Sequence, residues 1–364
     1  MNPEARQAFN TLHNLISSPD IQNSFDTQLH AFLKADGNPR PQTANAKSSS
    51  AISRMLNQYA LPALALLRES RAIIQKRLQT TVLNSCKRRP VLELMIDMTT
   101  LEKTGVFENL PLSFFNDKYG LHLVVLYIVI GSQRFVWAAR IWRGKGSRSW
   151  VELALSLLRC LPAWLKTRFK CRVLADTGFG SSAFISGCAN LELAVVVGVP
   201  CDRTTEQGRK LSELPVQGAM LLLKGCTTPV YVAWFKLIGK NGAYEWRYVV
   251  SSIAAHAKTI VRWGKRRWRI EAFFKTMKSR FGLNQFGQRT IKGVLRFFLL
   301  AFIAYLLVFW SWNRKAGNEF EIPDWIELAR EAQVWLVTWV VQFELDQRQA
   351  RVDQVVKLKA IVIA

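Results

Sequence analysis

The segment from residue 261 to residue 282, VRWGKRRWRIEAFFKTMKSRFG, constrains the fold more than any other part of the chain. Its apolar side chains recur at steps of three and four residues, which predicts a helix with one buried stripe. The other positions are mostly basic, and Glu271 is the single acid of the segment. The buried stripe consists of Ile270, Phe273, Phe274, Met277 and Phe281.

A second stripe lies beside the apolar one. At 100° per residue it contains Arg267, Glu271, Lys275 and Lys278, so one carboxylate is held among cations on an edge that faces solvent. Two interpretations are open. Glu271 can stabilise the helix through ion pairs with Arg267 and Lys275, each four residues away, or it can belong to a functional site.

The charge of the whole chain favours a functional interpretation. The 364 residues include 50 Lys and Arg against 26 Asp and Glu, which gives a formal net charge of +24 and a pI near 10.2. Solubility does not need such an excess, so we expect a polyanionic partner. The bases gather in residues 134–172 and 256–300, each with one acid, whereas residues 316–364 hold more acids than bases.

The cysteines and the N-terminal sequence indicate a cytoplasmic protein. No C-x-x-C pair occurs and no His stands at zinc-ligand spacing, so we expect reduced core thiols. The first residues lack the features of a signal peptide, and no export is expected. The six cysteines are Cys86, Cys160, Cys171, Cys188, Cys201 and Cys226.

One apolar run raises the question of a membrane. Residues 297–312, FFLLAFIAYLLVFWSW, are uncharged but fall short of the ~20 residues that span a bilayer. A core helix laid across a sheet explains the run more economically, and a transporter would need more apolar segments. We therefore expect no membrane partner.

The remaining patterns predict an α/β protein with helical N-terminal and C-terminal parts, and the helical pattern at 51–83 is broken at Pro62. Strand-like runs at 91–98, 120–130, 134–142, 171–175 and 194–199 combine with helical segments at 149–166 and 182–189, the order of a mixed sheet flanked by helices. Short β-rich runs with frequent turns predict an all-β insertion after them. We divide the chain into a helical region 1–88 suited to DNA binding, a first core part 89–199, an insertion 200–255, a last core part 256–315, and a helical region 316–364 suited to dimerisation.

Three carboxylates stand out on this plan. Asp97 and Asp176 end predicted buried strands, and Glu271 lies on the basic helix. Acids at strand ends arise easily by chance, and Asp176 can simply cap the turn before Gly178. A third acid in an otherwise basic helix makes chance a weaker explanation.

Phosphodiester chemistry would account for such a trio. Two Mg²⁺ or Mn²⁺ ions held by three carboxylates can neutralise charge at phosphorus and activate water or a 3′ hydroxyl. Carboxylate oxygens suit these hard cations, and the sequence has no His or Cys cluster for zinc. We expect Asp97, Asp176 and Glu271 to be the catalytic residues and the metal ligands.

These residues resemble a known family. The sequences IDMT around Asp97 and ADTGFG around Asp176, with the R-x3-E-x6-K array of Arg267, Glu271 and Lys278, are similar to the DDE transposases of bacterial insertion sequences, specifically the insertion-sequence-four family. The resemblance covers residues 91–312. It implies a ribonuclease-H-like core with a β-strand insertion, cut-and-paste transposition, and a homodimer in the synaptic complex. The family has a Tyr seven residues before the Glu, where this chain has Gly264.

The resemblance also implies DNA contacts. Arg267 and Lys278 match family positions that bind phosphates of the DNA ends, and we add Lys265, Arg266 and Lys275 from the basic helix. If a DNA hairpin forms, an extruded base needs an aromatic receptor, and we expect Trp234 or Trp246 of the insertion to stack on it. For each Trp, a place in the sheet core is the alternative.

Two other functions stay open. A ribonuclease-H-like nuclease without strand transfer would share the acids, although it would not need the R-x3-E-x6-K array. A domesticated DNA-binding descendant would keep the basic surfaces and lose an acid, whereas all three acids are present here.

Overall fold

The computed structural model describes residues 3–39, 47–80, 89–105, 107–238, 242, 244–312 and 327–336, with positions 338, 342, 345, 349, 352 and 353 beyond them. The chain divides into two compact units. The helical unit comprises Met1–Gln75 and Thr276–Ala364, and the sheet unit comprises Lys76–Lys275. Cys86 and most of residues 316–364 lie outside the described residues.

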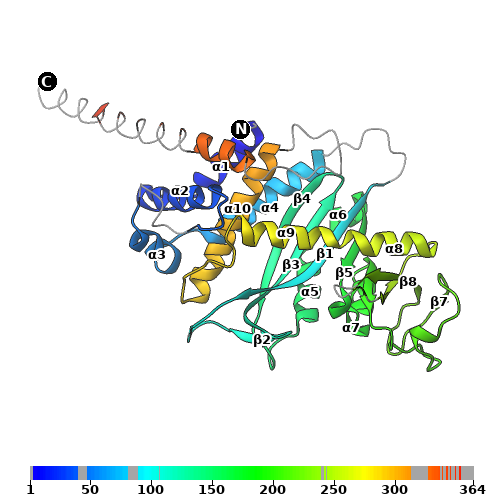
Figure 1. Cartoon of the computed structure of the whole chain (residues 1–364). Coiled ribbons are helices and arrows are strands. Elements are labelled where there is room, and N and C mark those ends of the chain that lie inside the picture. The colour runs from blue at the N-terminus through cyan, green and yellow to red at the C-terminus, as the bar shows by residue number, and fades with distance from the viewer. Residues whose placement is uncertain are drawn as a thin grey trace, which may run out of the picture. The chain divides into compact units, whose positions relative to one another are not determined.

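The sheet unit contains one mixed sheet (Figure 1). Its strands follow the order β2-β3-β1-β5-β6-β9-β8-β7. Strand β4 also pairs with β3, on the edge opposite β1. The strands are β1 (Val91–Glu102), β2 (Ser113–Phe115), β3 (Lys118–Ile130), β4 (Gln133–Trp142), β5 (Lys170–Ala175), β6 (Ala194–Val199), β7 (Met220–Leu221), β8 (Val230–Ile238) and β9 (Tyr244–Ser251).

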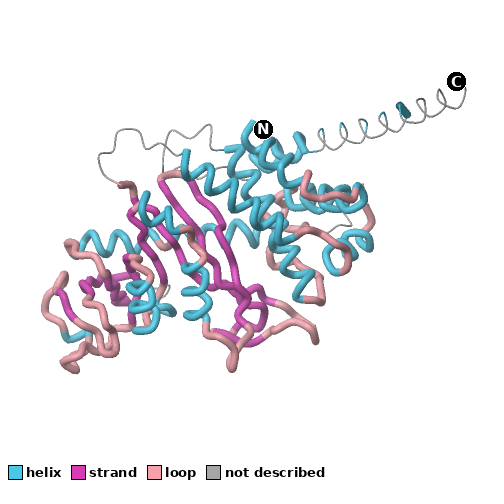
Figure 2. Tube along the Cα trace, turned by 180° about the vertical axis from the view of Figure 1, so that it is seen from behind, coloured by secondary structure: helices cyan, strands magenta, loops and turns pink. Residues whose placement is uncertain are grey.

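The central part of the sheet has ribonuclease-H-like topology. The strands β4, β3 and β1 are antiparallel neighbours, and β5 and β6 then run parallel to β1. Helices α8 (Ala257–Arg266) and α9 (Trp268–Ser279) cross one face in Figure 1, while α5 (Trp150–Arg159) and α7 (Ser182–Asn190) cover the other, seen from behind in Figure 2. The predicted fold class, a mixed α/β sheet flanked by helices, is confirmed.

Strand β1 and the predicted helix 149–166 differ from their predicted bounds. Strand β1 does not end near Asp97 but continues to Glu102, because β3 offers it a partner as far as Gly120 and the intervening threonines favour strand. The predicted helix 149–166 is divided at Pro162 into α5 and α6 (Ala163–Arg168), because proline cannot donate the backbone hydrogen bond that a continuous helix requires.

The insertion after β6 is not a separate β module. Strand β9 pairs antiparallel with β6 and then with β8, so residues of the insertion extend the main sheet. The rest of residues 200–229 consists largely of turns, one 3₁₀ helix at Leu211–Glu213 and isolated bridges. The predicted β-rich character is therefore present, and hydrogen bonding to β6 places it rigidly beside the core.

The helical unit contains α1 (Pro3–His13), α2 (Pro19–Leu33), α3 (Ser49–Asn57) and α10 (Ile291–Trp312). A further helix, α4 (Ala63–Thr80), runs from this unit into the sheet unit. The break between α3 and α4 falls just before and at Pro62, as the sequence predicted. Arg296 of α10 is buried and donates to the carbonyls of Met55 and Leu56, which satisfies the C-terminal end of α3.

Helix α10 is the apolar run that raised the membrane question. Residues Ile291–Ser311 have the length and mean hydropathy of a membrane span, 2.2, but 89% of the apolar window is buried within the protein. Within its own unit the helix packs against α1, α2 and α3, with the rings of Phe32 and Phe297 5.0 Å apart. The expectation of a core helix agrees with this burial, although its packing partners here are helices and the expected partner was a sheet.

Candidate active site

Asp97 occupies the middle of β1 and is only 8% exposed. Its Oδ2 accepts from the guanidinium of Arg267 at 3.1 Å, and its Oδ1 accepts from the backbone N–H of Met98. Burial, followed by repulsion from the Asp176 carboxylate, raises the pKa of Asp97 to about 7, and Arg267 opposes this shift. Glu271 adds a smaller repulsion. Asp97 therefore feels the charge of both other predicted acids.

Asp176 lies next to Asp97 because of strand register. The last parallel pair between β1 and β5 joins Ile96 to Ala175, so Asp97 and Asp176 each come one residue after that pair. The Asp176 Oδ1 accepts from the backbone N–H of Gly178 at 3.0 Å, which is the turn-capping role named as the alternative. Capping uses one carboxylate oxygen and also fixes the direction of the side chain.

The turn after Asp176 is packed closely against β6. A Cβ at Gly180 would lie 2.3 Å from the carbonyl oxygen of Gly198, and a Cβ at Gly198 would lie 2.6 Å from the Thr177 hydroxyl. Glycine is therefore required at both positions for this approach. The GFG part of the ADTGFG sequence thus includes a packing requirement in addition to any chemical one.

Glu271 stands across from Asp97 on α9. Its Oε1 accepts from the Arg267 guanidinium at 2.8 Å, while the same guanidinium bonds Asp97. The intrahelical ion pair that the sequence offered as the simple interpretation is present, but Arg267 also joins it to the sheet. In the described part of the chain, no three His, Cys, Asp or Glu side chains are grouped closely enough to hold a metal ion as they are placed.

The donor set nevertheless suits a divalent cation of the hard type. Its members are carboxylates from β1, from the end of β5 and from α9, and Arg267 supplies the positive charge that holds two of them near each other. The raised pKa of Asp97 indicates that this charge compensates the acids only in part.

The predicted single helix 261–282 is divided at Arg267. Residues on either side form α8 and α9, and the amide of Arg267 bonds the carbonyl of Gly264 in a tighter turn. The predicted apolar stripe is confirmed, since its five side chains are buried. The change of helix at Arg267 puts this residue where it reaches both Asp97 and Glu271.

A buried ionic cluster beside the acids was not predicted from the sequence. Glu93, on the same face of β1 as Asp97, is 3% exposed and accepts from Arg266 at 2.8 Å and from Arg269 at 3.3 Å. Arg172 of β5 stacks over the Trp263 ring at 3.7 Å and feels the charge of Glu93. The sequence signal that could have predicted this cluster is Glu93 itself, a charged residue inside the apolar run VLELMIDM.

The remaining predicted phosphate contacts differ in their surroundings. Lys265 is exposed, with its ammonium 5.0 Å from the Phe235 ring, and Lys275 is exposed on α9. Lys278 is half-buried and belongs to the helical unit. Arg266 differs because its guanidinium forms an ion pair with the buried Glu93. Its contact with a DNA phosphate stays a prediction, and that contact would have to compete with this ion pair.

The two tryptophans of the insertion share one face of the β8–β9 pair. Trp234 lies opposite Tyr248 and Trp246 opposite Lys236, whose ammonium is 4.9 Å from the Trp246 ring. The opposite face of the β8–β9 pair carries Val249, which contacts Gly264 of α8. Trp234 and Trp246 therefore point away from the face that α8 covers. Base stacking by either one stays a prediction, and Trp246, 48% exposed, is the more accessible.

Gly264, where the resembled family has Tyr, is explained by packing. A Cβ at this position would lie 3.1 Å from both methyl carbons of Val249, so a larger residue would force α8 away from β9. The neighbouring Trp263 stacks its ring on the Arg172 guanidinium.

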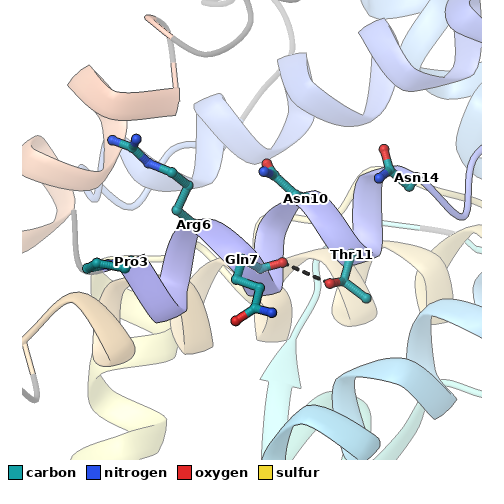
Figure 3. A pocket seen from close by; sticks show the side chains of 6 residues that line it. All are labelled: Pro3, Arg6, Gln7, Asn10, Thr11 and Asn14. Carbon is teal, nitrogen blue, oxygen red and sulfur yellow. Dashed lines mark hydrogen bonds between the residues drawn. The ribbon is translucent and has the colours of Figure 1, made fainter.

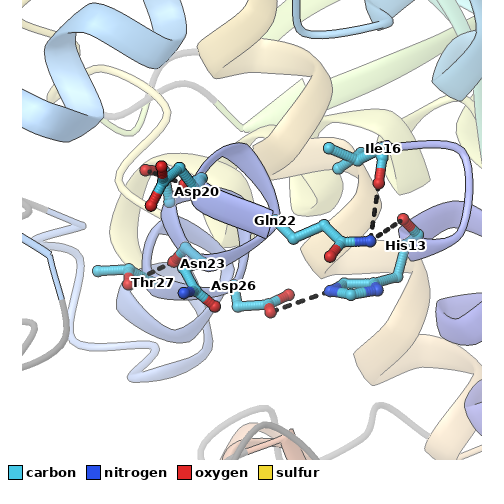
Figure 4. A network of polar contacts seen from close by, with 8 residues as sticks. His13, Ile16, Asp20, Gln22, Asn23, Asp26 and Thr27 are labelled. Atoms are coloured by element: carbon cyan, nitrogen blue, oxygen red, sulfur yellow. Dashed lines mark hydrogen bonds and ion pairs between the residues drawn. The ribbon is translucent and has the colours of Figure 1, made fainter. Parts of the chain in front are cut away.

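The helical unit has two polar features, and neither resembles a catalytic site. An open hollow of about 420 Å³ on α1 is lined by Pro3, Arg6, Gln7, Asn10, Thr11 and Asn14, with no acid among them (Figure 3). Behind this helix, buried His13 pairs with Asp26 at 3.1 Å, and Gln22 donates to the Ile16 carbonyl (Figure 4). These bonds hold α1 on α2.

A comparison with protein families gives a match over the middle of the chain. The family model described as a transposase DDE domain matches residues 115–307, more than half of the chain, a span that includes Asp176 and Glu271 but begins after Asp97. The chain therefore belongs to the transposase DDE domain family. The function of this class is DNA transposition, and the chain is a transposase enzyme of the DDE type.

A solved structure gives a more distant likeness. The chain is similar to a chain of the cryo-electron-microscopy structure of a piggyBac transposase synaptic complex with hairpin DNA, with 11% identity and a TM-score of 0.47. The likeness covers 89% of this chain and 73% of that chain. A comparison with curated protein sequences found no match.

Proposed function

We propose that this chain is a cut-and-paste transposase of the insertion-sequence-four type, acting in the bacterial cytoplasm on nucleoid DNA. It would cleave the transposon ends and join the freed 3′ hydroxyl to target DNA. The observation that carries the proposal is the placement of the three acids in a protein of charge +24: strand register sets Asp176 beside Asp97, and Arg267 bonds both Asp97 and Glu271.

In this proposal the three carboxylates hold two Mg²⁺ or Mn²⁺ ions. When bound, these ions would neutralise charge on the phosphodiester and activate the attacking hydroxyl. The chain's own residues prepare the site. The Gly178 N–H orients Asp176. The Arg267 guanidinium bonds Asp97 and Glu271 and so offsets the repulsion between these two carboxylates.

DNA ends would bind along the exposed cations of α8 and α9. Lys265 and Lys275 face solvent and form no ion pair with an acid of the described residues, which suits contact with phosphates. A homodimer would bring two ends together in one synaptic complex. Arg267 would contribute both to the acids and, by its family position, to the phosphate of the cleaved end.

The test is cleavage of labelled DNA carrying the inverted repeats that flank the coding sequence. Asp97→Ala, Asp176→Ala and Glu271→Ala should each reduce cleavage in Mg²⁺ by roughly a thousandfold or more and leave DNA binding unchanged or tighter, because a negative charge has been removed. Glu152→Ala is a matched control, since that acid only caps α5. Near wild-type cleavage by any one acid variant would remove that residue from the site.

A strand-transfer assay separates the transposase from a nuclease. Pre-cleaved ends with a free 3′ hydroxyl are incubated with a supercoiled plasmid, and joined products are counted. A transposase inserts the ends and duplicates a short target sequence. Cleavage without joined products under any metal condition would instead favour a ribonuclease-H-like nuclease.

A further inference from the structure

A second cationic element lies outside α8 and α9, between β4 and α5. Residues 143–149, RGKGSRS, connect β4 to α5 and carry three cations and no acid. Arg143, Lys145 and Arg148 are exposed, and within the described part of the chain they form no ion pair within 4 Å. We name this segment the cationic loop.

The cationic loop has a defined shape. The tryptophans that flank it, Trp142 and Trp150, meet edge to face with ring centroids 5.2 Å apart, so the two ends of the loop are held together. Ser147 closes the turn by donating its hydroxyl to the Gly144 carbonyl at 2.7 Å. Gly144 and Gly146 have φ of +87° and +84°, which glycine adopts without strain. The cations are thus presented by a fixed backbone.

The loop is joined to the acid site through a short chain of hydrogen bonds. The Trp150 indole N–H donates to the Gly178 carbonyl at 2.9 Å, and Gly178 N–H donates to Asp176. The loop also leaves β4 at the same edge of the sheet at which Asp176 leaves β5, because β4 and β5 both run parallel to β1. Loops at the carboxyl ends of parallel strands are the usual place for ligands in such sheets.

Strand transfer requires two duplexes at one set of acids. The exposed cations of α8 and α9 provide one phosphate-binding surface, on the face that carries Arg267 and Glu271. The cationic loop provides another, attached to Asp176 from the side of β4 and α5. We propose that the cationic loop binds the phosphate backbone of target DNA. This inference rests on the proposed transposase function.

The salt dependence of binding measures the phosphate contacts directly. Binding of a random-sequence duplex without element ends is followed by fluorescence anisotropy at several salt concentrations, without divalent cations. For Arg143→Ala/Lys145→Ala, the log–log slope should become less negative by about 1.8, since each lost contact removes about 0.9. The matched control, Arg159→Ala/Lys170→Ala, removes one Arg and one Lys from the far end of α5 and the start of β5 and should leave the slope unchanged.

Catalytic assays decide whether the duplex is the target. In the loop variant, hydrolytic nicking at the element ends should stay within about twofold of wild type, while joining of pre-cleaved ends to plasmid falls roughly tenfold or more. Equal loss of nicking and joining would make the loop an end-binding element and overturn the proposal, as would a salt slope equal to that of the control. If the wild type neither nicks nor joins, the proposed function fails, whereas the salt slopes still decide whether the loop binds DNA. Melting temperatures of both variants check their folding.

Discussion

At the scale of single residues, Asp97 combines burial with two carboxylate neighbours. Its pKa is raised from the ordinary value of 3.8 to about 7, so the folded protein retains a proton that the unfolded chain has already lost between these pH values. This difference in bound protons sets the sign of the change in stability with pH. The unfolded state binds fewer protons over this range, and the stability of the metal-free protein should fall as the pH rises from about 4 to about 7.

Replacing Asp97 by Asn tests this sign. The amide keeps the shape of the side chain and removes the ionisation, so the variant should gain a few kcal/mol of stability at pH 8 relative to wild type without divalent cations. The difference should vanish near pH 4. Melting temperatures measured across this pH range provide the check. A variant that is less stable than wild type at pH 8 would show that the Arg267 ion pair outweighs the cost of burying the charge.

At the scale of elements, the helix pair α8–α9 is fixed on the sheet by Glu93. This carboxylate is buried and meets two guanidinium groups, one from each helix. Glu93 lies on β1 four residues before Asp97 and on the same face. Its ion pairs with Arg266 and Arg269 therefore also fix the distance between Glu271 of α9 and the sheet. The chain can therefore change direction at Arg267 while both helices stay in place above Asp97 and Asp176.

Glu93→Gln should be strongly destabilising. Removing the charge of the buried Glu93 leaves two half-buried guanidinium groups with weaker compensation, a loss of about 3 kcal/mol or more. The matched control is Glu102→Gln on the same strand, where an exposed pair with Lys118 should contribute less than about 1 kcal/mol. Urea denaturation measures both. Equal small losses would mean that water already compensates the Glu93 cluster.

At the scale of the whole molecule, the net charge of +24 makes DNA affinity a function of salt. Lys275→Ala should weaken binding to all duplex sequences and reduce the log–log slope by about 0.9, because the exposed ammonium contacts phosphate without reading bases. Lys278→Ala should do the same if its half-buried ammonium reaches DNA. Lys170→Ala, at the start of β5, serves as the control. A slope for Lys275→Ala that equals the control would assign this lysine to an ordinary solvated helix face.

The sequence by itself determined whatever depends on neighbours within a few residues. The three- and four-residue spacing from Ile270 to Phe281 identified the buried face of α9, and the order of apolar runs identified a mixed sheet with helices on it. Composition identified a polyanionic partner. The proline at position 62 was enough to predict the break between α3 and α4, because its effect is confined to the local backbone.

Only the tertiary structure decided what depends on register and on residues far apart in the chain. Pairing with β3 extended β1 beyond Asp97, and pairing with β5 brought Asp176 beside it. Arg267 bonds an acid 170 residues away as well as one on its own helix, and Glu93 meets arginines more than 170 positions later. The alternation of β8 and β9 turned Trp234 and Trp246 away from α8, because a side chain's face in a sheet is set by its hydrogen-bonded partner strands, which no local pattern encodes.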